Sequence, residues 1–346
     1  MKKLCIYHGN CADGFGAATA VRIALGAENV DFHAGRHGQL PPDVTGRSVI
    51  IVDFSYKREV LIQMAGQAES ILILDHHKSA HIDFSDLSNR VDNITAIFDM
   101  ERSGAVMAWQ HFLPERPVPQ LLLHVQDRDL WKFELDGTRE VQACVFSHPF
   151  EFPLWESLLL DIDPQTLREE GQAIERKHAK DIRELIASAA SRTVIAGYDV
   201  PVLNAPFMFS SDAGNILGEG EPFAACYSDS PKGRGYSLRS AADGVDVSLI
   251  ASKFGGGGHK HAAGFMLPID QLGNLATPMD VNLQPHQVQA VNEHLELQLK
   301  IAALETFFNT ELFSQLPINE QDLMLCQLTT MLEYCHILEL RIAVFD

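Results

Sequence analysis

The sequence predicts an α/β protein with a parallel-sheet first domain, a smaller α/β second domain and a terminal antiparallel α-helical hairpin. Continuous apolar runs alternate with helical stretches early in the chain, which is typical of a parallel sheet covered on both faces. Shorter strands and turns follow, and the C-terminal part carries a heptad-like apolar pattern. We place the segments at residues 1–150, 151–192, 193–270 and 285–346.

The first domain is expected to contain three buried strands, each followed by a helix. The strands are short runs of large apolar residues bounded by polar or small ones. They are expected at 4–7, 48–52 and 71–74, with helices at 14–25, 56–67, 103–112 and 120–128. Gly26 would end the first helix as a C-terminal glycine.

A long connecting helix is expected before the second domain. Acidic and basic residues alternate through 161–192, a pattern that supports a solvent-exposed helix. The second domain then shows short strands and turns in the segments TVIAGYDVPVLNA, FAACYSD, GYSLRS and AAGFML.

The expected hairpin consists of helices at about 286–311 and 320–344, joined by a turn at Leu316-Pro317. Apolar residues recur at alternating spacings of four and three, the seam pattern of packed helices. The seam residues are Leu297, Ile301, Leu304 and Phe308, followed by Met324, Leu328, Met331, Cys335, Leu338, Ile342 and Phe345.

Composition limits the classes of partner. The 346 residues carry a formal net charge of −19, so long nucleic acid will not be held by a general basic surface. No apolar run is long enough to span a membrane, and the N-terminal apolar stretch is too short for a signal peptide. The six cysteines include no CxxC pair, so we expect a reducing, cytoplasmic location.

Polar side chains with metal-binding chemistry follow each expected strand of the first domain. His8 follows the first strand, Asp53 the second, and Asp75-His76-His77 the third. The carboxyl ends of parallel strands open into one ligand crevice, so these groups should converge. Each residue alone has a more ordinary explanation, such as a helix cap, but three consecutive strands ending in this way favour one site. Asp13 and Asp127 can join it.

These donors are oxygens and imidazoles, which suit Mn²⁺ or a similar ion, with Mg²⁺ or Co²⁺ as alternatives. Two neighbouring ions need a bridging carboxylate, and Asp53 is the natural candidate. Such a pair stabilises the attacking and leaving oxygens of a phosphoryl transfer.

A glycine-rich segment, residues 254–264, provides a second candidate site. Its backbone N–H groups can approach an anion closely, and His259 lies beside them. We expect Gly256, Gly257 and Gly258 to contribute to phosphate binding. Arg239 is a further phosphate-binding candidate, although a surface salt bridge is an equal alternative for it.

Together these residues resemble the DHH phosphoesterase superfamily. Asp75-His76-His77 corresponds to its name motif, and GGGGHKHAAGF resembles the glycine-rich signature of its associated C-terminal domain. The resemblance covers about residues 1–270 and is greatest to oligoribonuclease-like members, through SLRS, the DRDLW-like motif and GGGGH.

The resemblance implies a role for each matching residue. It makes His77 a catalytic residue near the scissile phosphate, with Asp75 holding the motif, and assigns substrate binding to Arg239 and His259. The active site would lie between the two domains, and closure would bring His259 over the phosphate. The implied metal ligands are His8, Asp13, Asp53, His76 and Asp127, with Asp53 bridging two Mn²⁺ ions.

Cys11 departs from the family pattern, which commonly has an aspartate at this position. Either Cys11 is a ligand, or the metal has one fewer protein ligand and an extra water. We favour the second interpretation.

The hairpin resembles small helical proteins by which phages sequester cyclic-nucleotide immune signals. The resemblance rests on Leu312-Phe313 and on helix-periodic residues between Met331 and Ile342. It implies a phage-encoded chain acting in the host cytoplasm. An oligomerisation hairpin is an equal alternative, and a homo-oligomer is expected.

Three functions therefore remain open. The first is a phosphodiesterase for short or cyclic oligonucleotides, and the second is a short-RNA exonuclease. The third is a nucleotide-sequestering protein with a decayed hydrolase domain. None of them involves a membrane or long nucleic acid.

Overall fold

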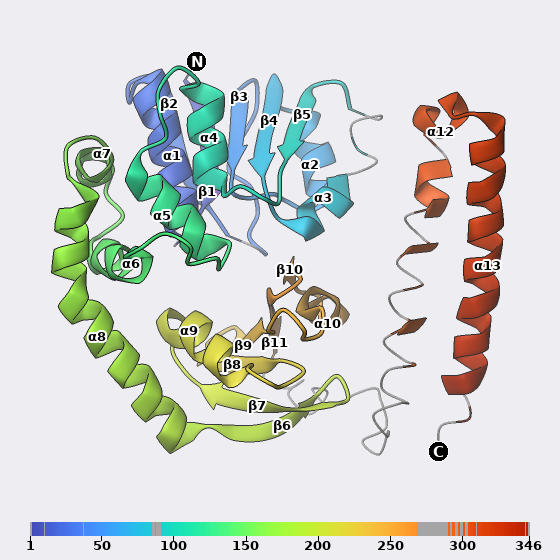
Figure 1. Ribbon diagram of the computed structural model, residues 1–346. Helices are drawn as coiled ribbons and strands as arrows, with labels where there is room; N and C mark the ends of the chain where they lie inside the picture. The colour runs from blue at the N-terminus through green and yellow to red at the C-terminus, as the bar shows by residue number, and fades with distance from the viewer. Residues whose placement is uncertain are drawn as a thin grey trace. The chain divides into compact units, whose positions relative to one another are not determined.

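The computed structural model shows an α/β protein with two sheets and C-terminal helices (Figure 1). It describes residues 2–9, 11–36, 38–84, 87, 91–268, 290, 293–294, 297, 300–301, 304–308, 310–342 and 344. By its internal contacts the chain divides into two units, one with residues 1–190, 203–228 and 235–266, the other with the remainder. Both candidate sites described below lie within the first unit.

The first sheet is parallel and has the strand order β2-β1-β3-β4-β5. Side chains alternate between its faces, so Cys5 of β1 packs into one hydrophobic cluster while Leu4 and Ile6 pack into another. The strands are β1 (Lys3–His8), β2 (Val30–Gly35), β3 (Ser48–Val52), β4 (Ser70–Asp75) and β5 (Ile94–Phe98). Two apolar faces confirm the prediction of a sheet covered on both sides.

Helices from several parts of the chain cover this sheet. One face packs against helices that bring Phe15, Trp109 and Trp155 together, and the other against Leu61 and Met64. The helices are α1 (Ala12–Leu25), α2 (Arg58–Ala65), α3 (Lys78–Phe84), α4 (Gly104–Phe112), α5 (Gln120–Asp129), α6 (Thr138–Ser147) and α7 (Phe152–Leu160).

The expected connecting helix is α8 (Pro164–Ala189), which begins with Asp163 as a capping residue. Its central Gly171 allows close approach to α6, because a Cβ there would lie 1.8 Å from the carbonyl oxygen of Glu140.

The second sheet is mixed and has the strand order β10-β11-β9-β8-β7-β6. Its elements are β6 (Ser191–Ile195), β7 (Tyr198–Asn204), α9 (Phe207–Leu217), β8 (Ala224–Ser230), β9 (Gly233–Arg239), α10 (Val247–Lys253), β10 (Gly257–His259) and β11 (Ala262–Leu267).

The C-terminal segment contains α12 (Glu311–Gln315) and the long α13 (Ile318–Ile342). Cys335 and Leu338, two residues of the expected seam, are buried, and residues 304–308 are helical. The Tyr334 hydroxyl donates to Glu293 at 2.6 Å, and His294 lies 3.3 Å from Glu339, which is the pairing of an antiparallel hairpin. The expected seam residue Phe345 and most of 269–292 lie outside the described residues. Among the described helices, none is long and apolar enough to cross a membrane.

Candidate active site

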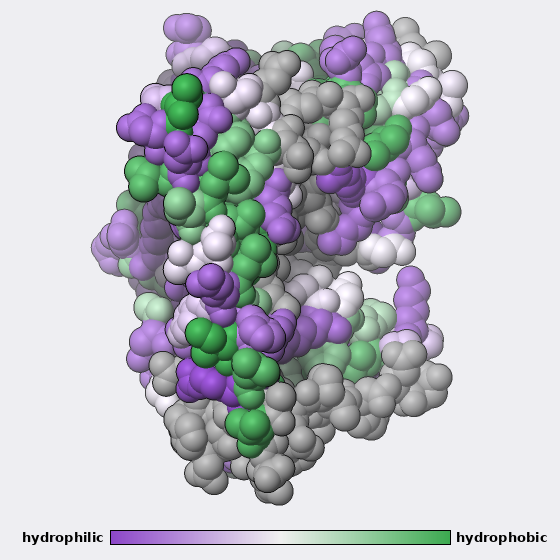
Figure 2. All heavy atoms as spheres, turned by 90° about the vertical axis from the view of Figure 1, so that its right-hand side faces the viewer, coloured by the Kyte–Doolittle hydropathy of each residue, from purple (hydrophilic) through white to green (hydrophobic). Residues whose placement is uncertain are grey.

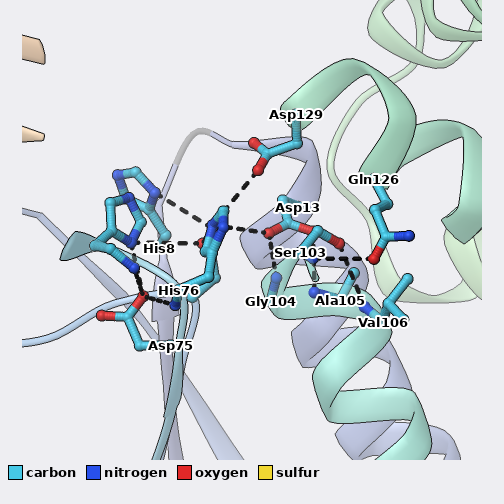
Figure 3. A network of polar contacts seen from close by, with 12 residues as sticks. His8, Asp13, Asp75, His76, Ser103, Gly104, Ala105, Val106, Gln126 and Asp129 are labelled. Carbon is cyan, nitrogen blue, oxygen red and sulfur yellow. Dashed lines mark hydrogen bonds and ion pairs between the residues drawn. The ribbon is translucent and has the colours of Figure 1, made fainter. Parts of the chain in front are cut away.

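The imidazole of His76 lies at the centre of a group of carboxylates (Figure 3). Its Nε2 is 3.0 Å from Asp53 Oδ1, 3.4 Å from Asp129 Oδ2 and 3.6 Å from Asp13 Oδ2. His76, Asp53 and Asp13 are almost completely buried, whereas Asp129 is exposed at the edge of the group. The end of β4 therefore delivers its imidazole to the position that the parallel-sheet argument predicted.

Asp53 occupies a constrained position directly after β3. Its backbone φ is +52°, a left-handed conformation that is unusual for a residue other than glycine. Its Oδ1 faces His76, while its buried Oδ2 accepts no hydrogen bond and has His8 Nδ1 at 3.4 Å. The carboxylate thus lies between His8 and His76, as a bridging ligand requires.

Asp13 is fixed by the N-terminus of α4. Its two oxygens accept hydrogen bonds from the backbone N–H groups of Gly104, at 2.6 Å, and Ala105, at 2.9 Å. A Cβ on Gly104 would lie 2.4 Å from Asp53 Cβ, so only glycine fits here. Sequence analysis missed Gly104; the signal was the Ser103-Gly104 pair, because Ser103 caps α4 by accepting from Val106.

Asp75 organises the two histidines that follow it. Its Oδ1 accepts from the backbone N–H of His76 at 2.8 Å and lies 2.6 Å from His77 Nδ1. A carboxylate can only accept, so Nδ1 of His77 carries the hydrogen in this contact. Asp75 is completely buried, and it orients the imidazole of His77 rather than joining the carboxylates around His76.

The structure places Asp129, not Asp127, beside His76. The Asp127 carboxylate accepts hydrogen bonds from the backbone of Glu134 and Leu135 and from the Thr138 hydroxyl, at 2.8, 3.0 and 2.6 Å. Residues two apart on a helix point about 200° apart, so the two aspartates of α5 face different surroundings. Asp129, and not the predicted Asp127, therefore lies beside His76, and the assignment of the ligand stays a proposal.

The second domain contributes His259, which follows the glycine run. Its ring stacks on His77, with centroids 4.6 Å apart, and lies 5.0 Å from that of His76. The structure thus brings His259 next to His77 of the Asp75-His76-His77 motif, although the two histidines are 182 positions apart in the sequence.

The other predicted substrate-binding residues have well-defined partners. The Arg239 guanidinium donates to the hydroxyls of Ser211 and Ser237 and to the carbonyl of Leu238. These partners are uncharged, so the contacts are not the surface salt bridge that was the alternative for Arg239. The Gly256 N–H donates to the carbonyl of Ala251 at 2.9 Å, so this amide is not available to an anion. Gly257 and Gly258 lie in β10, and their predicted role in phosphate binding stays a prediction.

Charges around the site shift the acidity of its members strongly. Burial, together with Asp53 and Asp129, raises the pKa of Asp13. Burial would lower the pKa of His76, but Asp129, Asp53 and Asp13 outweigh it and raise that pKa to about 10. In the second domain, burial and the nearby His77 and His76 lower the pKa of His259 to about 2, which keeps it neutral.

The donor set fits divalent metal ions. Three carboxylates and two imidazoles converge, and two buried atoms, Asp53 Oδ2 and His76 Nδ1, have no hydrogen-bond partner. Within the described part of the chain, ligand atoms of Asp13, His76 and Asp129 lie within 4.8 Å of one another. The same holds for His8, Cys11 and Asp53, so the structure also brings Cys11 to the site. Oxygen and nitrogen donors crowded in this way are stabilised by a cation.

Comparisons with known proteins give one family match and two relatives. Residues 284–344 match the family model described as Sequestin. The chain is 33% identical over 287 residues to uncharacterized protein R106 of Acanthamoeba polyphaga mimivirus, covering 75% of this chain and 66% of that one. It is 25% identical over 228 residues to oligoribonuclease NrnB of Bacillus subtilis (strain 168), covering 56% and 52%. The chain thus covers less than two thirds of either relative.

RecJ from Thermus thermophilus, in complex with Mn²⁺, aligns at a TM-score of 0.46 and 16% identity, covering 86% of this chain and 57% of that one. The Asp75-His76-His77 motif thus resembles that of the DHH phosphoesterase superfamily, the chain is similar to an oligoribonuclease, and residues 284–344 match Sequestin.

Proposed function

We propose that the chain is a two-metal, Mn²⁺-type phosphodiesterase that hydrolyses short or cyclic oligonucleotides. The observation that carries this proposal is the convergence of carboxylates and imidazoles on Asp53 and His76, with two buried polar atoms, Asp53 Oδ2 and His76 Nδ1, that have no hydrogen-bond partner. Relationship to an oligoribonuclease supports a nucleotide substrate. The net charge of −19 supports a short one, since long polymers bind through many basic contacts.

The positions of the residues suggest a role for each of them. We assign metal binding to His8, Asp13, Asp53, His76 and Asp129. When bound, a divalent pair lowers the pKa of water and neutralises charge on the reacting phosphate. Further roles fall to His77, Asp75, His259 and Arg239.

These further roles are orientation and substrate binding. Asp75 orients His77, whose ring and that of the neutral His259 form a stacked pair beside the carboxylates. We propose that these two imidazoles contact the phosphate and that Arg239 binds a second anionic group of the substrate.

The proposal is tested with full-length protein and Mn²⁺. Release of mononucleotide from di- to pentanucleotides and of linear product from cyclic dinucleotides should both be followed. Asp53→Ala and His76→Ala should remove turnover while the protein stays folded. His111→Ala, an exposed histidine outside the site, serves as the matched control. Absence of turnover on every substrate, alongside intact Mn²⁺ binding, would refute the proposal.

The Sequestin match favours a second candidate function for residues 284–344. We propose that this segment binds cyclic nucleotides and that the chain is a phage enzyme acting on immune signals in the host cytoplasm. The relationship to a viral protein supports this source. Calorimetric titration of cyclic dinucleotides into the full-length Asp53→Ala protein and into a chain lacking 280–346 tests it. Equal affinity of both proteins would remove the segment from the proposal.

Exposed apolar side chains on α13 support the expected homo-oligomer. Leu325, Leu332, Ile337 and Leu340 are 46–55% exposed, and Figure 2 shows hydrophobic side chains among polar ones on the side of α13. Such surfaces are typical of protein contacts. Measuring the mass in solution with and without residues 280–346 tests this, and an unchanged oligomeric state would contradict it.

A further inference from the structure

We propose that Cys11 is a metal ligand and that the His8–Cys11–Asp53 position selects Zn²⁺ over Mn²⁺. This inference rests on the two-metal function proposed above and changes the ion expected at one of its two positions. It also reverses our interpretation from the sequence, in which a water replaced the side chain of residue 11.

The first support is geometric. The Sγ of Cys11, a ring nitrogen of His8 and a carboxylate oxygen of Asp53 all lie within 4.8 Å of one another. At Zn–N and Zn–S bond lengths of about 2.0 and 2.3 Å, two ligand atoms of one ion lie roughly 3 to 4 Å apart. The three groups are therefore within reach of a single ion after small side-chain adjustments.

The second support comes from the start of α1. Cys11 is the N-cap residue of this helix, a position where Ser, Thr, Asp or Asn usually accepts a backbone hydrogen bond. The Cys11 side chain makes no such bond. It lies beside His8 and Asp53 instead.

The third support is the different chemistry of the two positions. One combines a thiolate, an imidazole and a carboxylate, which suits Zn²⁺. The other combines His76 with Asp13 and Asp129, and this oxygen-rich set suits Mn²⁺. Asp53 lies between both. Metal binding at the first position would release the thiol proton to solvent, because the thiolate is the ligand.

Cys144 and Cys335 also lie in clusters that could bind a soft ion through a thiolate, and the test must separate them from Cys11. Cys144 Sγ lies 3.9 Å from His148 Nε2 and 3.5 Å from Glu170 Oε2. Cys335 lies near His294 and Glu339 in the hairpin. Neither cluster includes a residue of the group around His76, so replacing either cysteine provides a matched control.

The test is a titration of metal-free, full-length protein with Co²⁺, a spectroscopic probe for Zn²⁺ sites. Thiolate coordination gives a charge-transfer band in the near ultraviolet. We expect the band in the wild type and in Cys144→Ser and Cys335→Ser, and its loss in Cys11→Ser and Cys11→Asp. The ratio of Zn²⁺ to Mn²⁺ affinity should fall at least about tenfold in Cys11→Asp. Zn²⁺ should also protect Cys11, followed by mass spectrometry, from alkylation.

The other possible results separate this inference from the proposed function. A band that survives Cys11→Ser, or Co²⁺ binding by the wild type without a band, overturns the inference. A Cys11-dependent band in a protein that hydrolyses no nucleotide refutes the proposed function and leaves the metal site standing. Turnover with Mn²⁺, together with a band that does not depend on Cys11, supports the proposed function and refutes Cys11 as a ligand.

Discussion

Replacing either aspartate at the end of α5 by asparagine separates a metal ligand from a structural residue. Asp127 and Asp129 are two positions apart, and asparagine preserves the size and shape of both side chains. The structure gives them different roles, so one variant should lower the melting temperature and the other should weaken Mn²⁺ binding.

Asp127→Asn should lower the stability of the metal-free protein. The carboxylate accepts three hydrogen bonds, at 2.6 to 3.0 Å, from the segment that follows α5. Asparagine has only one acceptor oxygen, so its NH₂ group must face the partly buried backbone N–H of either Glu134 or Leu135. That mismatch costs roughly 1–3 kcal/mol. In a protein of this size it corresponds to a melting temperature about 2–6 °C lower.

Asp129→Asn should leave the metal-free protein as stable as the wild type, or slightly more stable. Burial, followed by opposing effects of His76 and Asp53, raises the pKa of Asp129. A raised pKa means that folding disfavours the charged form, so removing the charge does not destabilise the fold. Metal binding should instead fall by more than the 10- to 100-fold typical of losing an outer-shell partner.

Calorimetry provides both measurements. Unfolding scans of the metal-free variants give the melting temperatures, and titration with Mn²⁺ gives the affinities. If Asp127→Asn abolished Mn²⁺ binding at an unchanged melting temperature, while Asp129→Asn bound normally, the assignment of Asp129 would be refuted.

Three further changes test other parts of the structure. Gly104→Ala places a Cβ 2.4 Å from Asp53 Cβ and should weaken Mn²⁺ binding measured by calorimetry, whereas Gly66→Ala, which has room for a methyl group, should not. His178 and Arg128 outweigh burial and hold the pKa of Asp212 below its usual 3.8. The charged form therefore stabilises the fold above that pH, and this stabilisation is lost as the pH falls through the folded-state pKa. Asp212→Asn should therefore lower the melting temperature at pH 7, and the difference from wild type should shrink below pH 4. Adding Mn²⁺ at 100 times its Kd should stabilise the metal-free protein by about 2.7 kcal/mol in unfolding experiments, and a chelator should reverse this.

The sequence predicted the central strands well because they are buried on both faces. The expected strand at 48–52 coincides with β3, and those at 4–7 and 71–74 lie within β1 and β4. A strand covered on both sides consists almost entirely of large apolar residues, so its ends are clear. Those ends are also what located His8, Asp53 and the Asp75-His76-His77 motif.

The outer strands were not predicted, because they are only partly buried. β2 and β5 are the edge strands of the sheet, and each mixes buried residues with exposed or half-exposed ones. Their sequences, VDFHAG and ITAIF, are short and lack a continuous apolar run. Edge strands have fewer neighbours that impose a hydrophobic pattern, so the sequence alone does not separate them from loops.

Helix phase explains why the sequence does not show which of Asp127 and Asp129 lies beside His76. Both lie in one polar stretch, and both are aspartates within the last turn of α5. Which one faces His76 depends on how α5 is rotated against the sheet, and tertiary packing sets that rotation. The same packing brings the N-terminus of α4 to Asp13, a contact between residues 91 positions apart that no local pattern encodes.

The glycine run shows how one sequence pattern can have two physical causes. Glycines were expected there because bare backbone can approach an anion, yet the structure requires them for the approach of backbone to backbone. A Cβ on Gly256 would lie 2.1 Å from the carbonyl oxygen of Gly264, and one on Gly258 would lie 2.5 Å from that of Ala262. Gly258 also has a φ of +142°, which disfavours other residues. The run thus closes the β10–β11 pair tightly, and that tight pairing positions His259 against His77.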